Sequence, residues 1–578
     1  MDIQFDSNNI NLAWTEKSSN INPDLTEHSY KFEQGIYHLH DIFYLAVGYG
    51  VANSFMVRGN DSLIIIDTCE NIETASQILK DFRKYTDLPI STIIYTHNHL
   101  DHIGGVKAYV NKEDVNAGKV KIYAHSTMMD GIRNMAANVG HILNRRSIYS
   151  FGLALKKGDD GHINDGIGPE IIIGTPTFIV PTDTFDSVLK LIVSGIRMEL
   201  YYAPSETDNE IFIYFPDYEL VQSADIIMGE TYPNIHSIRG TKYRDPTKWW
   251  KAIDMIRELQ PKYIFPSHGR PIEGKENVMD MLTAYRDAIQ FTHDQTIRYM
   301  NEGYTPDELV EVLPSLPDNL KNHAWLGEFY GTVKHSVRQI YNGYLGWFIG
   351  DPTSLDPLPQ RERALKYINT MGGRDNILKI GKESYDNKEY KWAAEILTYL
   401  INININDKEA KLLKAKCLKK LGYGCKNINW RNWYLSASQE LDGTFDHEFV
   451  NNIDGINAND IMAEIPTRLL LNQLCVKLDT SRSNNIHRSY GFYVGDEYYV
   501  FNIRSCVVEF CENNNQLVDH TAKINDNIIK KILSNKTNIL EQKHNIELGD
   551  NTTIYDIEQF FSYFDLEKKY PLLTHPHI

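Results

Sequence analysis

The chain has 578 residues, more than one hydrophobic core normally supports, so we expect two to four domains. Its 42% hydrophobic and 23% charged residues are typical of a globular protein and exclude a disordered or fibrous chain. The formal net charge of −17 argues against a nucleic-acid partner, because phosphate binding needs clustered Lys and Arg. An anionic substrate would need local positive charge, for instance from metal ions.

The cysteines and the N-terminal residues bear on the compartment. Six cysteines are scattered without any CxxC pair, which predicts free thiols in a reducing environment. The first residues are acidic and lack the apolar stretch of a signal peptide. No apolar run approaches the ~20 residues that cross a bilayer. We therefore expect a cytoplasmic protein without a transmembrane segment.

Short β-branched runs alternate with amphipathic stretches in the first half of the chain. Residues 62–67 have the pattern of a buried strand, and residues 74–84 have that of a helix. Further strands are predicted at residues 90–96, 120–124, 171–180, 210–215 and 263–266. This interleaving predicts an α/β domain, in which a site usually forms where strands end.

The second half changes character twice. Helical spacing dominates from about residue 279 to residue 349, and again at residues 377–423 after a Pro-punctuated linker at residues 351–359. We interpret this stretch as a packing or dimerisation module, because it holds about one helical-hairpin unit and a solenoid needs several. After about residue 441 a small antiparallel sheet is predicted at residues 490–494, 497–504 and 506–510.

The sequence THNHLDHIGG at residues 96–105 indicates a metal site at the end of a strand. Alternate residues of an extended segment point the same way, so His97 and His99 can converge on one ion. Asp101 and His102 follow the turn and can face a second ion a few ångströms away. Imidazole with carboxylate suits Zn²⁺, Fe or Mn, and zinc is the default for hydrolysis.

Two ions need more ligands than this motif supplies. Asp225 follows a strand-like run and can bridge the ions, and His268 ends another strand. Between the motif and Asp225 lie carboxylates without a histidine, so either Glu206 or Glu210 is expected to complete the set. Asp67 is expected to orient a loop instead of binding metal. Two cations sharing one water lower its pKa from near ~16 towards ~7, which supplies hydroxide at neutral pH.

Several unusual stretches outside the motif carry a family resemblance. They are NRRSIYSFG (144–152), IRGTKYRD (238–245), YGTVKHSVR (330–338), YLGWF (344–348) and WRNWYL (430–435). With the motif, they resemble the alkyl sulfatases of the metallo-β-lactamase superfamily, and the likeness covers most of residues 36–441. The resemblance implies an α/β metallo-β-lactamase αββα sandwich at residues 1–285. It also implies an all-α dimerisation domain at residues 286–440 and a small α+β sterol-carrier-like domain at residues 441–578.

The resemblance also implies a set of ligands for two Zn²⁺ ions per chain. One zinc would be held by His97, His99 and Glu206, the other by Asp101, His102 and His268, with Asp225 in the bridging position. This assignment favours Glu206 over Glu210. The carboxylates expected to take part in catalysis are Asp101, Glu206 and Asp225.

Sulfate recognition needs fixed donors, and a bidentate Arg suits a tetrahedral oxyanion. Asn234 and Arg239 lie in the stretch that the family uses near its sulfate pocket, and Tyr341 is a further candidate. The expected reaction is hydrolysis of a small amphiphilic alkyl sulfate ester to alcohol and inorganic sulfate by a metal-bound hydroxide in a homodimer. Residues 207–209 and 269–270 depart from the family pattern near the pocket and bear on the substrate.

Three other readings compete with this expectation. The same fold could hydrolyse a thioester, a lactone or a phosphoester. A di-iron redox enzyme is disfavoured because the motif is HxHxDH, not HxExDH, and because no flavodoxin-like pattern follows. A lipid-binding protein, whose function resides in the C-terminal domain, would be favoured by loss of the metal ligands, yet all seven positions are filled.

Overall fold

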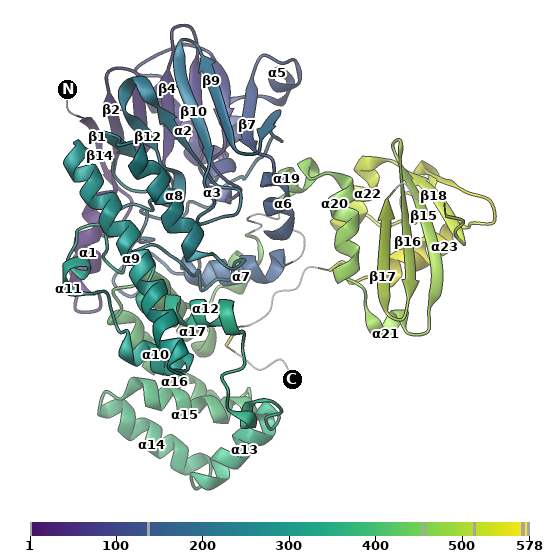
Figure 1. Cartoon of the computed structure of the whole chain (residues 1–578). Helices are drawn as coiled ribbons and strands as arrows, with labels where there is room; N and C mark the ends of the chain where they lie inside the picture. Colours follow the sequence, from purple (N-terminus) through teal and green to yellow (C-terminus); the bar gives the residue numbers. More distant parts are fainter. Residues whose placement is uncertain are drawn as a thin grey trace. The chain divides into compact units, whose positions relative to one another are not determined.

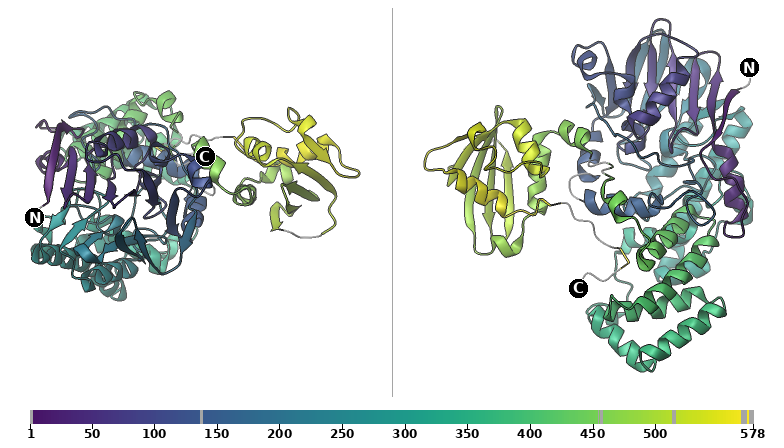
Figure 2. Two further views of the ribbon diagram at one scale, coloured as in Figure 1. Left: turned by 90° about the horizontal axis from the view of Figure 1, so that it is seen from above. Right: turned by 180° about the vertical axis from the view of Figure 1, so that it is seen from behind.

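The computed structural model describes residues 3–135, 139–453, 455, 458–512, 516–567 and 573–574. The chain divides into two compact units (Figures 1 and 2). The larger unit comprises Met1–Met128, Leu143–Gly455 and Pro571–Ile578, and the smaller one Met129–Ile142 and Ile456–Tyr570. All six cysteines are free, as their scattered positions predict. Among the described residues, no helix combines the length and apolar character that a bilayer crossing requires.

The first sheet of the larger unit carries the histidine-rich segment. Its eight strands pair in chain order, antiparallel from β1 to β5 and parallel from β5 to β8. They are β1 (Gln4–Asn11), β2 (Glu33–Leu39), β3 (Phe43–Val47), β4 (Ser54–Arg58), β5 (Leu63–Ile66), β6 (Ile90–Ile94), β7 (Lys121–His125) and β8 (Asp183–Phe185). β5 is apolar and buried along its whole length, because strands inside a parallel sheet are covered on both faces.

A second sheet of six strands packs against the first. Its order is β14-β13-β12-β11-β10-β9, with only β12 and β13 parallel among these neighbours. The strands are β9 (Val188–Val193), β10 (Ile196–Tyr202), β11 (Ile211–Phe215), β12 (Leu220–Gln222), β13 (Tyr263–Phe265) and β14 (Ile272–Glu273). The two inner faces share one core, in which Phe43 and Ile64 of the first sheet pack with Leu200 and Ile213 of the second.

Helices cover the outer faces of both sheets. α2 (Ile72–Phe82) and α4 (Val106–Tyr109) lie against the first sheet and each other. α8 (Pro246–Glu258) and α9 (Lys275–Asn301) cover the second, where Trp249 and Leu282 pack with Phe212. The predicted αββα sandwich is therefore confirmed. Shorter helices in the connections are α1 (Pro23–Ser29), α3 (Leu100–Ile103), α5 (Lys112–Asn116), α6 (Met128–Arg133) and α7 (Gly140–Ser150).

The prediction of a strand at residues 171–180 is wrong. The backbone of this segment bonds to loops and side chains instead of a neighbouring strand. The N–H of Ile172 donates to the Glu70 carboxylate at 3.1 Å, and the N–H of Thr177 donates to the Gly104 carbonyl at 2.6 Å. Phe178 and Ile179 are buried while Ile173 is exposed, so a short apolar run here indicates neither a strand nor burial along its whole length.

The second half of the larger unit is helical, as predicted. Its helices are α10 (Pro306–Val312), α11 (Asp318–Lys321), α12 (Val333–Leu345), α13 (Gln360–Thr370), α14 (Arg374–Asp386), α15 (Tyr390–Ile403), α16 (Lys408–Tyr423), α17 (Ile428–Asp442) and α18 (His447–Asn451). α13 to α17 bury a separate apolar core that includes Ile377, Leu397 and Leu400. The buried Arg431 of α17 joins this region to the sandwich by donating to the carbonyl oxygens of Asn20, Asp159 and Gly161.

The smaller unit contains a five-stranded sheet of order β17-β16-β15-β18-β19. Its strands are β15 (His487–Val494), β16 (Glu497–Arg504), β17 (Val507–Glu512), β18 (His520–Ile524) and β19 (Ile546–Leu548). Its helices are α19 (Asn459–Glu464), α20 (Thr467–Asn472), α21 (Thr480–Ser483), α22 (Asp526–Leu533) and α23 (Ile554–Ser562). Phe492 and Phe501 of the sheet contact Phe560 of α23. The predicted antiparallel β15–β16–β17 arrangement is confirmed, and the likeness to sterol carriers stays a prediction.

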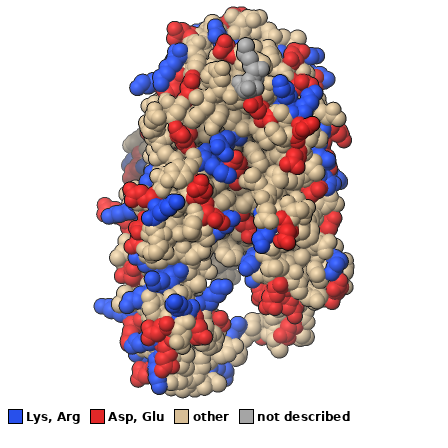
Figure 3. Space-filling model, turned by 90° about the vertical axis from the view of Figure 1, so that its left-hand side faces the viewer, with Lys and Arg blue, Asp and Glu red and all other residues tan. Residues whose placement is uncertain are grey.

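The charged side chains mix on the surface. On the face shown in Figure 3, Lys and Arg are interspersed with Asp and Glu, and uncharged residues separate them. On this face the two signs therefore partly neutralise each other.

Candidate metal centre

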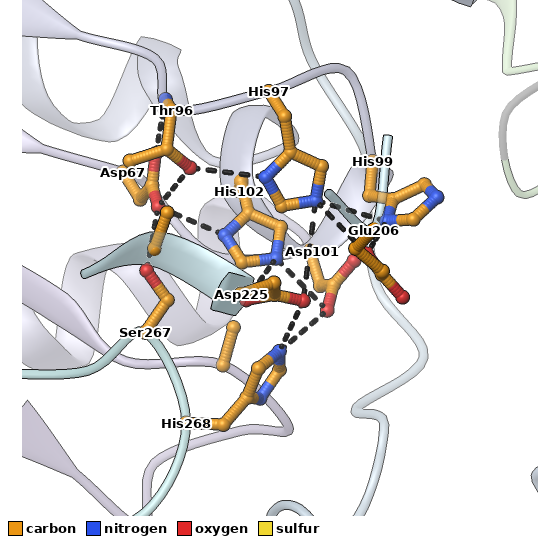
Figure 4. Close-up of polar contacts among 12 residues, drawn as sticks. Asp67, Thr96, His97, His99, Asp101, His102, Glu206, Asp225, Ser267 and His268 are labelled. Atoms are coloured by element: carbon orange, nitrogen blue, oxygen red, sulfur yellow. Dashed lines mark hydrogen bonds and ion pairs between the residues drawn. The ribbon is translucent and has the colours of Figure 1, made fainter. Parts of the chain in front are cut away.

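Seven predicted side chains gather where strands of the two sheets end (Figure 4). The loop after β6 carries His97 and His99, and α3, which follows directly, carries Asp101 and His102. The β10–β11 connection carries Glu206, and the segments after β12 and β13 carry Asp225 and His268. The side chains form two groups, and inside each group the ligand atoms all lie within 4.8 Å of one another. The first group is His97, His99, Glu206 and Asp225, and the second is Asp101, His102 and His268. Each group could hold one metal ion.

The Asp225 carboxylate lies between the two groups. Its Oδ2 is 3.2 Å from His268 Nε2 and 4.0 Å from His97 Nε2. Its Oδ1 is 3.6 Å from His102 Nε2. One carboxylate therefore faces imidazoles of both groups, which is the placement that a bridging ligand needs.

Buried polar atoms at this centre need a partner that the protein does not supply. Within the described part of the chain, His102 Nε2 and Asp225 Oδ1 are buried and have no hydrogen-bond partner. Leaving such atoms unsatisfied costs free energy, and a cation would satisfy both. The donors are imidazole nitrogen and carboxylate oxygen, which suit Zn²⁺ and similar ions. The residues therefore fit two metal ions.

Contacts at Nδ1 orient the imidazole rings of His102 and His268. Asp67 accepts hydrogen bonds from the backbone and the hydroxyl of Thr96, at 2.9 and 2.8 Å, and lies 2.8 Å from His102 Nδ1. A carboxylate can only accept, so Nδ1 carries the proton and Nε2 is left as a ligand. The Val51 carbonyl, 2.8 Å from His268 Nδ1, orients that ring in the same way. The φ of 57° at Asp67 is a strained conformation, which the surrounding contacts hold.

Burial and neighbouring charges set the protonation of the candidate ligands. Burial lowers the pKa of His97, and His102 and His99 lower it further, so this imidazole is held in its neutral, metal-binding form. Burial alone would raise the pKa of Asp101. The neighbouring His102 and His268 outweigh burial and hold this pKa below its usual range, so Asp101 is ionised.

Glu206 and Glu210 have different surroundings. Glu206 Oε2 lies 2.8 Å from His99 Nδ1, and Oε1 forms a 2.7 Å ion pair with Arg244. Glu210 is fully buried and accepts a 2.9 Å hydrogen bond from the backbone N–H of Asp225. Glu206 thus faces the imidazoles, whereas Glu210 holds the backbone of another loop. This geometry favours Glu206 as the ligand.

The nominated sulfate contacts lie in different places. Arg239 is buried, and its Nη2 is 3.4 Å from His99 Nε2. Asn234 is also buried, and its backbone carbonyl oxygen accepts a 2.7 Å hydrogen bond from Arg244. Among the described residues, Arg239 Nε and Asn234 Oδ1 have no hydrogen-bond partner and are available to a ligand. Tyr341, by contrast, packs in the apolar core formed by the second sheet and its helices.

Tyr330 belongs to the surroundings of the site, and sequence reasoning did not nominate it. Burial raises its pKa, the charge of Glu206 raises it further, and the cations of Arg239 and Arg244 oppose both. These interactions place the phenol within the electrostatic field of the centre. The available signal was its position at the start of the stretch YGTVKHSVR (330–338).

Family profiles match both regions of the larger unit. The profile described as “Metallo-beta-lactamase superfamily” matches residues 47–268, which include all seven side chains of the candidate metal centre. The profile described as “Alkyl sulfatase dimerisation” matches residues 305–444. The second match falls on the helical region, α10 to α17.

Whole-chain relatives extend the match. The chain is 39% identical over 520 residues to a linear primary-alkylsulfatase from a Pseudomonas species, covering 89% of this chain and 98% of that protein. It is 30% identical to an alkyl/aryl-sulfatase of Saccharomyces cerevisiae, covering 93% of this chain and 84% of that protein. The sec-alkylsulfatase Pisa1 from Pseudomonas sp. has the same fold, with a TM-score of 0.91, 24% identity, and coverage of 98% of this chain and 90% of that one. The chain therefore belongs to the alkylsulfatase family of the metallo-β-lactamase superfamily.

Proposed function

We propose that this protein hydrolyses small amphiphilic alkyl sulfate esters to an alcohol and inorganic sulfate, using two Zn²⁺ ions per chain. The observation that carries the proposal is the gathering of His97, His99, Asp101, His102, Glu206, Asp225 and His268 beside a buried arginine. Arg239 next to His99 places a cationic donor where a sulfate oxygen could bind. The relatives are named alkylsulfatases, which supports alkyl sulfates as the substrate class.

The chain's own residues take distinct parts in this reaction. Bound zinc would polarise the ester and lower the pKa of a water molecule. Arg239 would hold a sulfate oxygen through its unpartnered Nε–H, whereas Asn234 would have to do so through its Nδ2 donor, because its unpartnered Oδ1 can only accept. Asp101, whose side chain is 24% exposed, is the carboxylate that solvent can reach, and we assign to it the proton of the attacking water. The negative charges of Glu206 and Asp225 would balance part of the positive charge of the two ions.

The experiment combines metal analysis with sulfate release. Purified protein loaded with zinc is assayed against alkyl sulfates of several chain lengths, and against a thioester, a lactone and a phosphoester. We expect two metal ions per chain and sulfate release that exceeds turnover of the other esters. Fewer than two ions, or preference for another ester, would contradict the proposal and favour a different hydrolase of the same fold. Lipid binding without any esterolysis would favour a lipid-binding protein.

We propose further that the chain is a homodimer. The end of α12 and the linker after it expose large apolar side chains inside the region matched by the dimerisation profile. They are Tyr344, Leu345, Trp347, Ile349, Leu355 and Leu358, and Trp347 is 68% exposed. A contiguous apolar segment of this kind usually marks a protein interface. Sedimentation velocity should show a dimer that Trp347→Ser weakens, and a parent monomer at micromolar concentration would contradict this.

Three less direct assignments are proposals as well. We propose a division into a catalytic region (residues 1–285), a helical region (286–440) and a C-terminal region (441–578). The separate core of α13 to α17 supports the helical region, whereas another core joins the second sheet to α9, α10 and α12 across residue 285. The mixed sheet with helices supports a sterol-carrier-like character for the third region. The free cysteines support a reducing, cytoplasmic compartment.

A further inference from the structure

Two asparagines link loops that carry ligand candidates from different sheets. Asn98 lies between His97 and His99 in the loop after β6. Asn209 lies three residues after Glu206 in the β10–β11 connection. Both are buried, with 2% and 4% of their surface exposed.

The two side chains form a closed pair of hydrogen bonds. The backbone N–H of Asn98 donates to Asn209 Oδ1 at 3.0 Å. Asn209 Nδ2 donates to Asn98 Oδ1 at 2.6 Å. A backbone N–H can only donate, so it determines which atom of the Asn209 amide is the oxygen. The amide therefore has one orientation, and both of its ends bind the same residue.

These bonds join residues that are 111 positions apart in the chain. One partner belongs to the segment that holds His97 and His99, and the other to the segment that holds Glu206. Glu210, one residue after Asn209, accepts the 2.9 Å hydrogen bond from the Asp225 backbone. The β10–β11 connection is thus fastened on two sides to the loops that complete the first ligand group.

We propose that Asn98 and Asn209 are a positioning pair that sets the separation between the His97–His99 segment and Glu206. Through this separation, the pair sets the affinity of the first ligand group for its metal ion. The Asn209 side chain of the pair is bonded to Asn98 at both ends of its amide. The pair acts through the backbone of the two ligand loops, as groups behind metal ligands generally do. The inference rests on the proposed metal centre but not on the substrate.

The test is a metal titration of Asn209→Ala in the full chain. Zn²⁺ or Co²⁺ is titrated into apoprotein in competition with a chromophoric chelator, which needs no substrate. Removal of residues that orient metal ligands typically weakens metal binding about 10–100-fold. We therefore expect one of the two ions to bind at least about tenfold more weakly. The other ion, held by Asp101, His102 and His268, should keep its affinity.

Asp208→Ala is the matched control. Asp208 neighbours Asn209, but its carboxylate is directed outward, 2.7 Å from Lys242 and 3.7 Å from Lys248. We expect this variant to bind both ions as the parent does. The same weakening in both variants would indicate a general disturbance of the connection and would overturn the proposal.

A double-mutant cycle adds a milder variant in case Asn209→Ala folds poorly. Asn98→Ala removes one acceptor but keeps the backbone N–H bond, so we expect a smaller loss of affinity. If the two residues act as a pair, the variant that combines Asn98→Ala with Asn209→Ala should bind the metal ion no more weakly than Asn209→Ala alone. Additive losses, unchanged affinity in Asn209→Ala, or equal weakening of both ions would overturn the inference. A parent that binds fewer than two ions would show instead that the metal centre itself is absent.

Discussion

The loop after β6 and the β10–β11 connection contribute to the same centre in opposite ways. The first, together with α3, places four candidate ligands within residues 97–102. The second contributes only Glu206, and its Asn209 and Glu210 bind the backbone and side chains of neighbouring loops. One region is rich in ligands, and the other holds the ligand loops together. Ligand density therefore locates a metal centre, while the contacts that give it its geometry lie in segments with ordinary composition.

The largest effect should follow a change in the ligand-rich loop. His97→Ala removes an imidazole that lies near both Glu206 and Asp225. We expect one metal ion to be lost and kcat/KM for an alkyl sulfate to fall on the order of 1,000-fold, since the activated water depends on both ions. Metal analysis and steady-state kinetics measure this together. Full activity with two bound ions would remove His97 from the centre.

Changes at the two glutamates sharpen the comparison inside the second region. Glu206→Gln removes the charge that faces His99, and we expect roughly a 100-fold loss of kcat/KM together with weaker binding of one ion. Glu210→Gln keeps the shape but turns one acceptor oxygen into a donor facing a backbone N–H. Its loss should be only about tenfold, with both ions retained. The reverse ranking would make Glu210 the ligand.

A third region extends the comparison to the proposed sulfate contact. Arg146 of α7 donates to the carbonyl oxygens of Ile238 and Arg239 and stacks on the Trp433 ring at 5.3 Å. Arg146→Met should release this loop and raise KM roughly fivefold, since charged hydrogen bonds are lost, while kcat and metal content stay near the parent values. Arg146→Lys, which cannot make both bonds, should resemble it. A change confined to kcat would contradict a role in substrate binding.

An effect of another kind, on stability instead of activity, is expected at Glu70 and appears as a pH dependence. Burial raises the pKa of Glu70 from 4.5 to about 8. The folded protein keeps this proton up to about pH 8, whereas the unfolded chain releases it near pH 4.5. Stability from this group is therefore lost as pH rises through that window, by up to about 1.4 kcal/mol per pH unit. Glu70→Gln should flatten the decline in urea midpoint between pH 5 and pH 8. An unchanged slope would mean that Glu70 is ionised in the folded state.

Parts of the fold were accessible from sequence for an identifiable reason. Period-two and apolar patterns predicted β5, β6 and β7 because their burial is strong and local. The same reasoning failed at residues 171–180, an apolar segment that pairs with no strand and in which Phe178 and Ile179 are buried while Ile173 is exposed. Tyr330 was not nominated because nothing in its local sequence reveals that Glu206 and Arg239 surround it.

The sequence by itself located the candidate metal centre, since four candidate ligands within residues 97–102 need no tertiary information to be recognised. From the residues alone, Glu206 and Glu210 were equivalent candidates, and the family resemblance favoured Glu206. Only the tertiary structure showed Glu206 facing the imidazoles, Glu210 holding the Asp225 backbone and Asn209 holding Asn98. The physical reason is that ligand identity is a local chemical property. The direction of a side chain depends instead on how strands far apart in sequence pair and pack.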